Sequence, residues 1–393
     1  METHLPITFP PGDNTPTPRP DLTTSTTISI SAGDELRRIR AALPIILERA
    51  TACAASGELP LIGWGLSKPR VQKLTSSDQW FFVGDIHGDF LAWHRLLAQV
   101  REHNGFRLCF LGDLVDRGPF SLECFAALLE ACMNYPGQIL WILGNHDEAL
   151  GWNATAELFF SKVEPSEFTD FLNEPKEGFA TREQLRKWGH LFIDVATRLP
   201  RATLFEDGLL ATHGGVPLGD QWDNLKTLEA FHHPRCLGDF TWTRAAEVPK
   251  KLGWKFDPAR RATSSSFEYG YKDLEGFAEA SLAVLPVRRV IRGHDHVENG
   301  QNCPPCYKAV PLLTINGFGF NYLNNSVNQY RSSLLLGVGQ AESLPMVKEL
   351  AVDNAEYLEI YPSGLADSPE SPAPDDEHKL PETIPQNYEA SYC

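Results

Sequence analysis

Five short apolar runs, each followed at once by a loop rich in Gly, Asp, Asn or His, constrain the fold of this chain more than any other feature. The runs are Trp80–Val83, Leu108–Leu111, Ile139–Leu143, Leu209–Thr212 and Val290–Arg292. Runs of this length and composition are typical of buried strands. Helical segments at Leu91–Val100 and Ser121–Asn134 separate the first three runs. The pattern therefore predicts β-α-β units whose polar loops meet in one crevice at the C-terminal strand ends.

Three further groups of residues extend this pattern. Apolar residues at helical spacing predict a helix over Asp34–Ala55 with Ser31 as its cap, although Pro44 inside it would allow a kink or a later start. The stretch Glu157–Leu199 has a mainly helical pattern, and we expect it to form a cap or a side wall. The candidate strands of a second sheet are Leu312–Ile315, Ser333–Val338 and Val347–Leu350.

Composition divides the chain into a central region and two polar ends. Residues 1–30 are rich in Pro and Thr and are predicted to be disordered, and residues 31–78 are predicted to form an N-terminal helical extension. Residues 79–361 hold all five runs and are predicted to form the main domain, with 157–199 as a helical insertion. Residues 362–393 carry Pro, Ser and acids without periodicity, which is typical of a solvated tail.

Charge and cysteine content limit the partners of the chain. The formal net charge of −16 argues against nucleic acid, because binding a phosphate backbone requires Lys and Arg. Much of this charge is local, since residues 351–393 carry ten acids against one base, Lys379. No run of 18 apolar residues exists, and Glu48 and Arg49 interrupt the best candidate, so we expect no membrane partner. The eight cysteines lack disulfide-framework spacing, which favours reduced thiols in the cytoplasm, and no particular oligomeric state is predicted.

The five loops contain the oxygen and nitrogen ligands that a pair of divalent metal ions needs. They are Gly84–Gly88, Gly112–Gly118, Gly144–Asp147, His213–Gly215 and Gly293–His296. Asp85 and His87 are two residues apart, so at an extended strand end their side chains can point the same way. The same spacing relates His294 and His296. Each loop alone is a weak signal, but five in order, each after an apolar run, indicate a metal site.

The loops read, in order, GDIHG, GDLVDRG, GNHD, HGG and GHDH. This set resembles the signatures of the calcineurin-like metallophosphoesterases, and in particular the phosphoprotein phosphatase branch, over residues 80–321. The resemblance implies an α/β fold in which a central β-sandwich is flanked by helices in four α-β-β-α layers, with metal ions at the strand ends. The third loop ends in Asp147, where the phosphoprotein phosphatases usually carry Glu. Together with GHDH, this residue points toward bacterial-type members.

The resemblance also implies a cofactor and its ligands. The cofactor would be two divalent metal ions, with Mn, Fe and Zn as the candidates. The first ion would be held by Asp85, His87 and His296, the second by Asn145, His213 and His294, and Asp113 would bridge both. A hydroxide that bridges the two ions would then attack the phosphorus in line.

The leaving group of such a reaction would receive a proton from His146 as the general acid. Asp116 would orient the His146 imidazole. A carboxylate that only caps its own loop is the alternative interpretation of Asp116.

Three side chains would bind the substrate phosphate. Arg117 is the first, because its planar guanidinium suits phosphate oxygens, and a surface ion pair is the alternative for it. Arg244 is the second, because Phe240–Arg244 looks like the Trp-x-Arg segment of bacterial-type members. Asn145 is the third. Arg292, which directly precedes the last loop, is expected to be structural.

The resulting prediction is a phosphomonoesterase that acts on phosphoserine or phosphothreonine in proteins. Hydrolysis of a dinucleoside polyphosphate or another small phosphate ester is the alternative activity. A non-catalytic phosphate-binding scaffold is the third reading. It is disfavoured because the complete ligand set is present together with His146 and Arg117, whereas a degenerate member of the family would have lost some of them.

One cysteine pair stands apart from this pattern. Cys303 and Cys306 enclose two prolines and could form a redox pair or half of a zinc site. No second pair at zinc-site spacing accompanies them, so a structural or incidental role is favoured.

Overall fold

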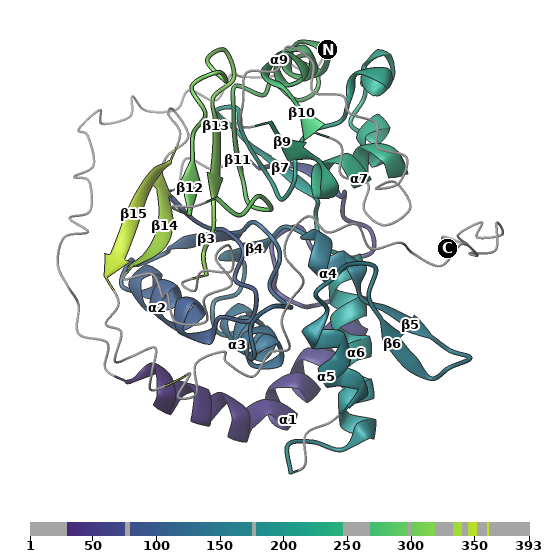
Figure 1. Cartoon of the computed structure of the whole chain (residues 1–393), viewed down its shortest axis with the longest axis vertical. Coiled ribbons are helices and arrows are strands. Elements are labelled where there is room, and N and C mark those ends of the chain that lie inside the picture. Colours follow the sequence, from purple (N-terminus) through teal and green to yellow (C-terminus); the bar gives the residue numbers. More distant parts are fainter. Residues whose placement is uncertain are drawn as a thin grey trace, which may run out of the picture.

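The computed structural model describes residues 30–74, 79–174, 178–246, 268–297, 300–318, 333–339 and 345–351, together with Ile360. Two β-sheets lie face to face at its centre, and helices cover their outer faces (Figure 1). The predictions for residues 1–29 and 362–393 fall outside the described residues.

The helices include every helix that the sequence patterns predict. They are α1 (Ala32–Ser56), α2 (Phe90–Arg101), α3 (Ser121–Asn134), α4 (Asn145–Ala149), α5 (Glu167–Asn173), α6 (Arg182–Thr197), α7 (Pro234–Trp242) and α9 (Tyr271–Ser281), with the 3₁₀ helices η1 (Gly219–Asn224) and η2 (Glu229–His232). The side chain of Ser31 caps α1, since its Oγ accepts a hydrogen bond of 3.1 Å from Asp34 N. Pro44 lies inside α1 and does not end it.

The first sheet has five strands. In spatial order they are β15 (Met346–Ala351), β14 (Ser333–Gly339), β2 (Trp80–Val83), β3 (Arg107–Phe110) and β4 (Ile139–Trp141). Strands β2, β3 and β4 are parallel, while β14 pairs antiparallel with both β2 and β15. The connections through α2 and α3 therefore form the predicted β-α-β units.

The second sheet has six strands. In spatial order they are β1 (Val71–Leu74), β7 (Ala202–Phe205), β8 (Leu209–Thr212), β11 (Arg289–Arg292), β13 (Leu312–Ile315) and β12 (Gln301–Asn302). Two short pairs lie outside the sheets, namely β5 (Gly151–Asn153) with β6 (Leu158–Phe160), and β9 (Arg244–Ala245) with β10 (Glu268–Tyr269).

The predicted division of the strands between the sheets is wrong in part. The last three candidate strands do not form the second sheet together. β13 lies in the six-stranded sheet beside β11, whereas β14 and β15 extend the five-stranded sheet at β2. The reason is that strand periodicity reports which residues are buried, while pairing depends on contacts between segments far apart in the sequence.

Alternation along the strands generates the four layers. In β2, Phe81 and Val83 pack into the core shared with α1, α2 and α3, while Trp80 and Phe82 face the other sheet. Successive side chains of a strand point to opposite faces, so a strand buried on both faces needs apolar residues throughout. On the far side of the six-stranded sheet, residues such as Leu210 and Val290 pack with residues of α7 and α9. The predicted α-β-β-α sandwich is thus confirmed.

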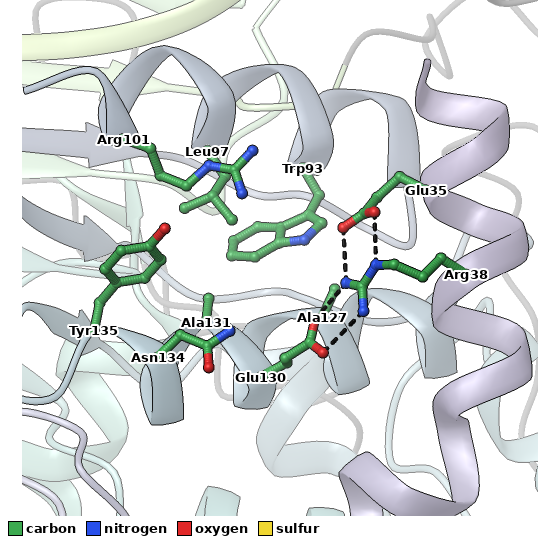
Figure 2. A pocket seen from close by; sticks show the side chains of 10 residues that line it. All are labelled: Glu35, Arg38, Trp93, Leu97, Arg101, Ala127, Glu130, Ala131, Asn134 and Tyr135. Atoms are coloured by element: carbon green, nitrogen blue, oxygen red, sulfur yellow. Dashed lines mark hydrogen bonds and ion pairs between the residues drawn. The ribbon is translucent and has the colours of Figure 1, made fainter. Parts of the chain in front are cut away.

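The outer helical layer contains a pocket between α1, α2 and α3 (Figure 2). Trp93 and Leu97 of α2 line it, and Arg38 of α1 pairs with Glu35 on the same helix and, across the rim, with Glu130 of α3. The side chain of Arg38 is 42% exposed, and such solvated pairs contribute only about 0–1 kcal/mol to stability. Packing of the apolar face of α1 therefore holds this helix more than its ion pairs do.

The two sheets approach each other closely at the C-terminal end of β2. An isolated parallel bridge joins Asp85 to Asn316, which directly follows β13. A Cβ atom on Gly84 would lie only 2.0 Å from the carbonyl oxygen of Ile315. Glycine is therefore needed at this position, and the close approach brings the loops of the two sheets together.

Candidate metal centre

All five polar loops converge where the parallel strands of the two sheets end. The loops after β2, β3 and β4 come from one sheet, and those after β8 and β11 come from the other. The seven residues proposed as metal ligands are all in this region, and six of them are at most 5% exposed: Asp85, His87, Asp113, Asn145, His213 and His294. The seventh, His296, has a side chain that is 11% exposed. Such burial of polar side chains is costly unless partners compensate it.

The first group of potential ligand atoms comes from Asp85, His87 and His296, whose ligand atoms lie within 4.8 Å of one another. His296 Nε2 is 3.2 Å from Asp85 Oδ2 and 3.2 Å from His87 Nε2. These three ligand atoms thus lie close enough together to hold one metal ion. His296 is the additional histidine of the fifth loop. In the structure it lies beside Asp85 and His87, which are two residues apart in the sequence.

The second group comes from Asp113, His213 and His294, again within 4.8 Å. His213 Nε2 is 3.3 Å from Asp113 Oδ1 and 3.0 Å from Asn145 Oδ1. His87 Nε2 is 3.6 Å from Asp113 Oδ2, on the side of the first group. Asp113 therefore lies between the two groups and offers one oxygen to each.

Backbone carbonyls fix the histidine rings. His87 Nδ1 lies 2.8 Å from the carbonyl oxygen of Val115, and His213 Nδ1 lies 2.7 Å from that of Leu111. A carbonyl can only accept, so each Nδ1 carries a proton and each ring turns its Nε2 toward the cluster. Metal-binding histidines are commonly oriented in this way.

Burial also sets the charge of the histidines. It lowers the pKa of His87, His294 and His296 well below the ordinary histidine value. These imidazoles are therefore neutral at pH 7, which is the state that binds a metal ion. The positive charges of Arg117 and Arg244 lower the pKa of His296 further, so both guanidinium groups are electrostatically close to the site.

The buried carboxylates of the cluster require a compensating positive charge. Burial raises the pKa of Asp85, and the neighbouring Asp113 carboxylate adds to this effect. Burial also opposes the ionisation of Asp113, but His213 holds the Asp113 pKa well below its usual range. Against its own burial, His213 has its pKa raised to about 9 by Asp113. A cluster in which a histidine must carry the balancing charge fits a divalent cation in composition and in electrostatics.

His146 and Asp116 form a buried pair beside the ligand cluster. His146 Nδ1 is 2.8 Å from Asp116 Oδ2, and the second oxygen of Asp116 accepts a hydrogen bond of 3.0 Å from Phe168 N. His146 N donates to Asp113 Oδ1 at 2.9 Å. The other ring nitrogen of His146, Nε2, is therefore left for a group outside this pair. The His87, Asp113 and His146 side chains also have ligand atoms within 4.8 Å of one another.

Helix α5 holds the second loop from outside. Glu167 Oε2 accepts a hydrogen bond of 2.7 Å from Arg117 N, next to the contact between Phe168 and Asp116. The stretch Glu157–Leu199 contains α5, all of α6 and strand β6, so helices make up most of it. Its contacts with Asp116 and Arg117 are those of a side wall.

Backbone strain is concentrated in the loops. Of the six described residues other than Gly with positive φ, five lie in the candidate site: His87, Asp113, Asp116, Arg117 and His294. Left-handed conformations of bulky residues cost about 1–3 kcal/mol each and persist where the surroundings enforce them, commonly at functional sites.

Asp147 is a clamp for the second loop. Its carboxylate accepts hydrogen bonds from Asp113 N at 2.9 Å, Leu114 N at 2.9 Å and Gly144 N at 3.1 Å. Burial raises the pKa of Asp147 to about 7, and the nearby Asp113 carboxylate contributes to this rise. The sequence pattern marks Asp147 only as a departure from a signature, whereas the structure shows why an acid is there.

Two arginines near the site have different environments. Arg292 is fully buried and its side chain pairs with Asp295 and with the Gly214 carbonyl, which agrees with the predicted structural role. The side chain of Arg244 is 39% exposed, and its Nη1 donates to Asp295 Oδ1 at 2.8 Å. Asp295 was not predicted, although its position between His294 and His296 in the GHDH loop was a usable signal.

A second network was also missed. Arg201 Nη2 pairs with Glu148 Oε1 at 2.5 Å, and Trp242 Nε1 donates to Glu148 Oε2 at 2.8 Å. Burial opposes ionisation of Glu148, but Arg201 holds the Glu148 pKa below its ordinary value. This network joins α4 to the segment that carries Arg244. Its residues lie far apart in the sequence and meet only in the folded structure.

Gly144 has to remain glycine, because a Cβ atom there would lie 2.1 Å from Asp113 N and 2.2 Å from Asp113 Oδ1. We expect Gly144→Ala to displace Asp113 and to lower metal-dependent turnover by roughly 100-fold, the scale of a 1 Å misplacement in an active site. Turnover and metal content of the purified variant test this. Gly238→Ala in α7 is the matched control, since a Cβ there meets nothing within 4 Å. Wild-type turnover and metal content in Gly144→Ala would contradict the expectation.

The fold and the site together place the protein in the class of metal-dependent phosphoesterases. The profile of the calcineurin-like phosphoesterase family matches residues 81–298, which is more than half of the 393 residues. The chain belongs to the calcineurin-like phosphoesterase family.

Three relatives illustrate this membership. The chain is 27% identical over 252 residues to a serine/threonine-protein phosphatase of Caenorhabditis elegans, covering 62% of this chain and 48% of the relative. It is 28% identical over 229 residues to the serine/threonine-protein phosphatase 4 catalytic subunit of Saccharomyces cerevisiae, covering 55% and 62%. It thus spans about half to three fifths of the length of these curated relatives. A solved protein serine/threonine phosphatase from Saccharomyces cerevisiae, with similarity to human phosphatase PP5, shares the fold at a TM-score of 0.53 and 17% identity, covering 80% of this chain and 90% of that one.

Two remaining sequence predictions concern the thiols and the membrane. Within the described ranges, Cys303 and Cys306 are free thiols and belong to none of the potential metal-binding groups. Among the helices of the described part of the chain, none is both long and apolar enough to cross a bilayer.

Proposed function

We propose that the protein is a metal-dependent phosphomonoesterase that removes phosphate from phosphoserine and phosphothreonine residues of proteins. The observation that carries this proposal is the convergence of two ligand groups that share Asp113, next to the His146–Asp116 pair. Family membership supports the reaction class. The names of the matched relatives, which are serine/threonine phosphatases, support the substrate class.

The proposed cofactor is a pair of divalent ions. Asp85, His87 and His296 would hold the first ion and Asn145, His213 and His294 the second, with Asp113 between them. Two divalent ions supply an activated water and a clamp for the transferring phosphoryl group when they are bound. Mixed carboxylate, amide and imidazole donors suit Mn, Fe or Zn, and metal availability selects among these in a cell.

The chain itself supplies the proton for the leaving group. His146 Nδ1 contacts Asp116, which orients the ring. Nε2 is then the nitrogen that would deliver the proton that the leaving serine or threonine oxygen requires. Asp116 is held in turn by α5 through Phe168 N, so the side wall fixes the orientation of the acid.

Arg117 and Arg244 would bind the non-bridging phosphate oxygens, and Asn145 would contact the same group. The strained backbone of Arg117 and its contact with Glu167 fix where its side chain starts. A guanidinium presents paired donors to phosphate oxygens, so two arginines can hold a dianionic phosphate in one orientation.

We also propose the cellular setting and the division of the chain. The seven described cysteines are all free thiols, which supports a reducing compartment such as the cytoplasm. The net charge of −16 supports a protein rather than a nucleic acid as the substrate. Residues 31–78 would form a helical extension, and 79–361 the catalytic domain with 157–199 as its insertion.

A direct comparison of substrates tests this proposal. Phosphate release from a phosphoserine peptide and a phosphothreonine peptide is measured beside release from a dinucleoside polyphosphate, with Mn²⁺ present throughout. We expect a kcat/KM for the peptides at least about tenfold higher, which corresponds to roughly 1.4 kcal/mol. A preference for the dinucleoside polyphosphate would replace the proposed substrate class, and no hydrolysis of any of them would favour a binding scaffold.

A further inference from the structure

The fifth loop contains an acid that the proposed reaction does not use. Asp295 lies between His294 and His296 and makes contacts on three sides. Its Oδ1 accepts from Arg244 Nη1 at 2.8 Å, and its Oδ2 accepts from Ala245 N at 3.2 Å and from Arg292 Nη1. A single carboxylate thus joins two arginines and the backbone of β9.

Arg292 makes the position of this carboxylate rigid. It is fully buried, and its Nε donates to the carbonyl oxygen of Gly214 in the fourth loop. The contacts run without interruption from the fourth loop through Arg292 and Asp295 to Arg244. Charge-assisted hydrogen bonds of this kind are the strong ones in proteins, because both partners are ionised.

The contacts of Arg244 show which of its hydrogen-bond donors remain available for a ligand. Nη1 donates to Asp295 Oδ1 and also lies 3.3 Å from the carbonyl oxygen of His294. Within the described part of the chain, Nε and Nη2 of Arg244 have no hydrogen-bond partner. These two nitrogens form one edge of the guanidinium, and such an edge can donate two parallel hydrogen bonds to phosphate oxygens.

We propose that Asp295 is a positioning residue that holds Arg244 by one guanidinium nitrogen and aims the opposite Nε–Nη2 edge at the substrate phosphate. The inference rests on the proposed function in one respect, namely that the site binds phosphate. Without Asp295, the long Arg244 side chain would lose its anchor and sample several rotamers in solvent. Ordering it again on binding costs conformational entropy, so phosphate affinity falls while the metal ligands stay in place.

A double-mutant cycle on phosphate binding tests this. The dissociation constant of inorganic phosphate is measured by isothermal titration calorimetry for Mn²⁺-loaded wild-type protein, Asp295→Asn, Arg244→Ala and the double variant. We expect each single variant to bind phosphate about tenfold more weakly. Because Asp295 acts through Arg244, the double variant should bind no more weakly than Arg244→Ala alone.

Two controls separate positioning from loss of structure. The metal content of Asp295→Asn should match that of the wild type, because every proposed metal ligand is retained, whereas its Tm should fall, because the fully buried Arg292 loses its ionised partner. If the Asn variant unfolds, Asp295→Glu provides the second test. It keeps the charge and shifts the carboxylate, so it should retain metal and weaken phosphate binding.

Two results would overturn the inference. One is wild-type phosphate affinity in Asp295→Asn, and the other is a loss that persists in full on top of Arg244→Ala. The second would mean that Asp295 acts through His294 or His296 instead. The proposed function fails separately. If wild-type protein binds phosphate and the cycle shows coupling but no phosphopeptide is hydrolysed, the positioning role stands and the phosphatase activity does not.

Discussion

Replacing Asp113 by Asn should lower metal-dependent turnover by roughly 10³-fold in kcat/KM. Asp113 is the residue that offers one carboxylate oxygen to each ligand group, toward His213 on one side and His87 on the other. An amide has a single weaker oxygen donor and no charge, so it cannot serve both groups. Losing one bridging ligand removes several kcal/mol of charge stabilisation, and about 4 kcal/mol corresponds to 10³ in rate.

The measurement for Asp113→Asn combines turnover with metal content by elemental analysis. The variant should bind less metal while its far-ultraviolet circular dichroism stays that of the wild type. Asp170→Asn is the matched control, because Asp170 is exposed on α5 and away from the ligand groups. Full metal occupancy together with undiminished turnover in Asp113→Asn would remove Asp113 from the site.

Replacing His146 by Asn should lower kcat on phosphoserine peptides by about 10² to 10⁴, the range that general acid catalysis contributes. The serine oxygen is strongly basic when it leaves and requires the proton from His146. By contrast, p-nitrophenolate is a weak base that leaves without much protonation. The same variant should therefore lose far less activity on p-nitrophenyl phosphate, and its KM on either substrate should change little.

Comparison of the two substrates gives this prediction its specificity. Asp116→Asn should reproduce the same difference between leaving groups at smaller amplitude, because Asp116 orients the His146 ring through the 2.8 Å contact with Nδ1. Equal losses of His146→Asn on both substrates would show that the His146 side chain does more than protonate the leaving group, for example beside His87 and Asp113, whose ligand atoms lie within 4.8 Å of its own.

The strands and the convergence of the five polar loops could be predicted from the sequence because both are encoded locally. Runs such as Trp80–Val83 alternate between two buried faces, so they are apolar throughout and stand out from their surroundings. The proposed ligand residues directly follow these runs, and parallel strands place their C-terminal ends at one edge. The five loops therefore meet for the same reason that the sheets form.

Other features depend on contacts that no local pattern reports. The pairing of β14 with β2 involves residues more than 250 positions apart, and it changes which sheet the late strands join. The partners of Asp295, Glu148 and Asp147 are likewise set by packing between loops. An acid beside a metal ligand looks the same in the sequence whether it binds metal, aims an arginine or clamps a backbone, and only the surrounding donors distinguish these roles.

The assignment of Asp116 shows the limit within a single motif. A loop-capping carboxylate and an orienting partner of His146 are equally compatible with the sequence of the second loop. In the structure one oxygen contacts His146 Nδ1 and the other accepts from Phe168 N. The second contact is with α5 and not with the loop that contains Asp116, so the structure favours the orienting alternative and adds a contact with the side wall.

A paired-metal site is the central feature of the proposed function, and one measurement tests it directly. Protein stripped of metal with a chelator is assayed for hydrolysis of p-nitrophenyl phosphate, with and without added Mn²⁺, while bound metal per chain is counted. We predict no turnover in the stripped protein, restored turnover with Mn²⁺, and saturation at two ions per chain. Turnover that is unchanged by stripping, or a chain that binds Mn²⁺ without hydrolysing the ester, would contradict the account.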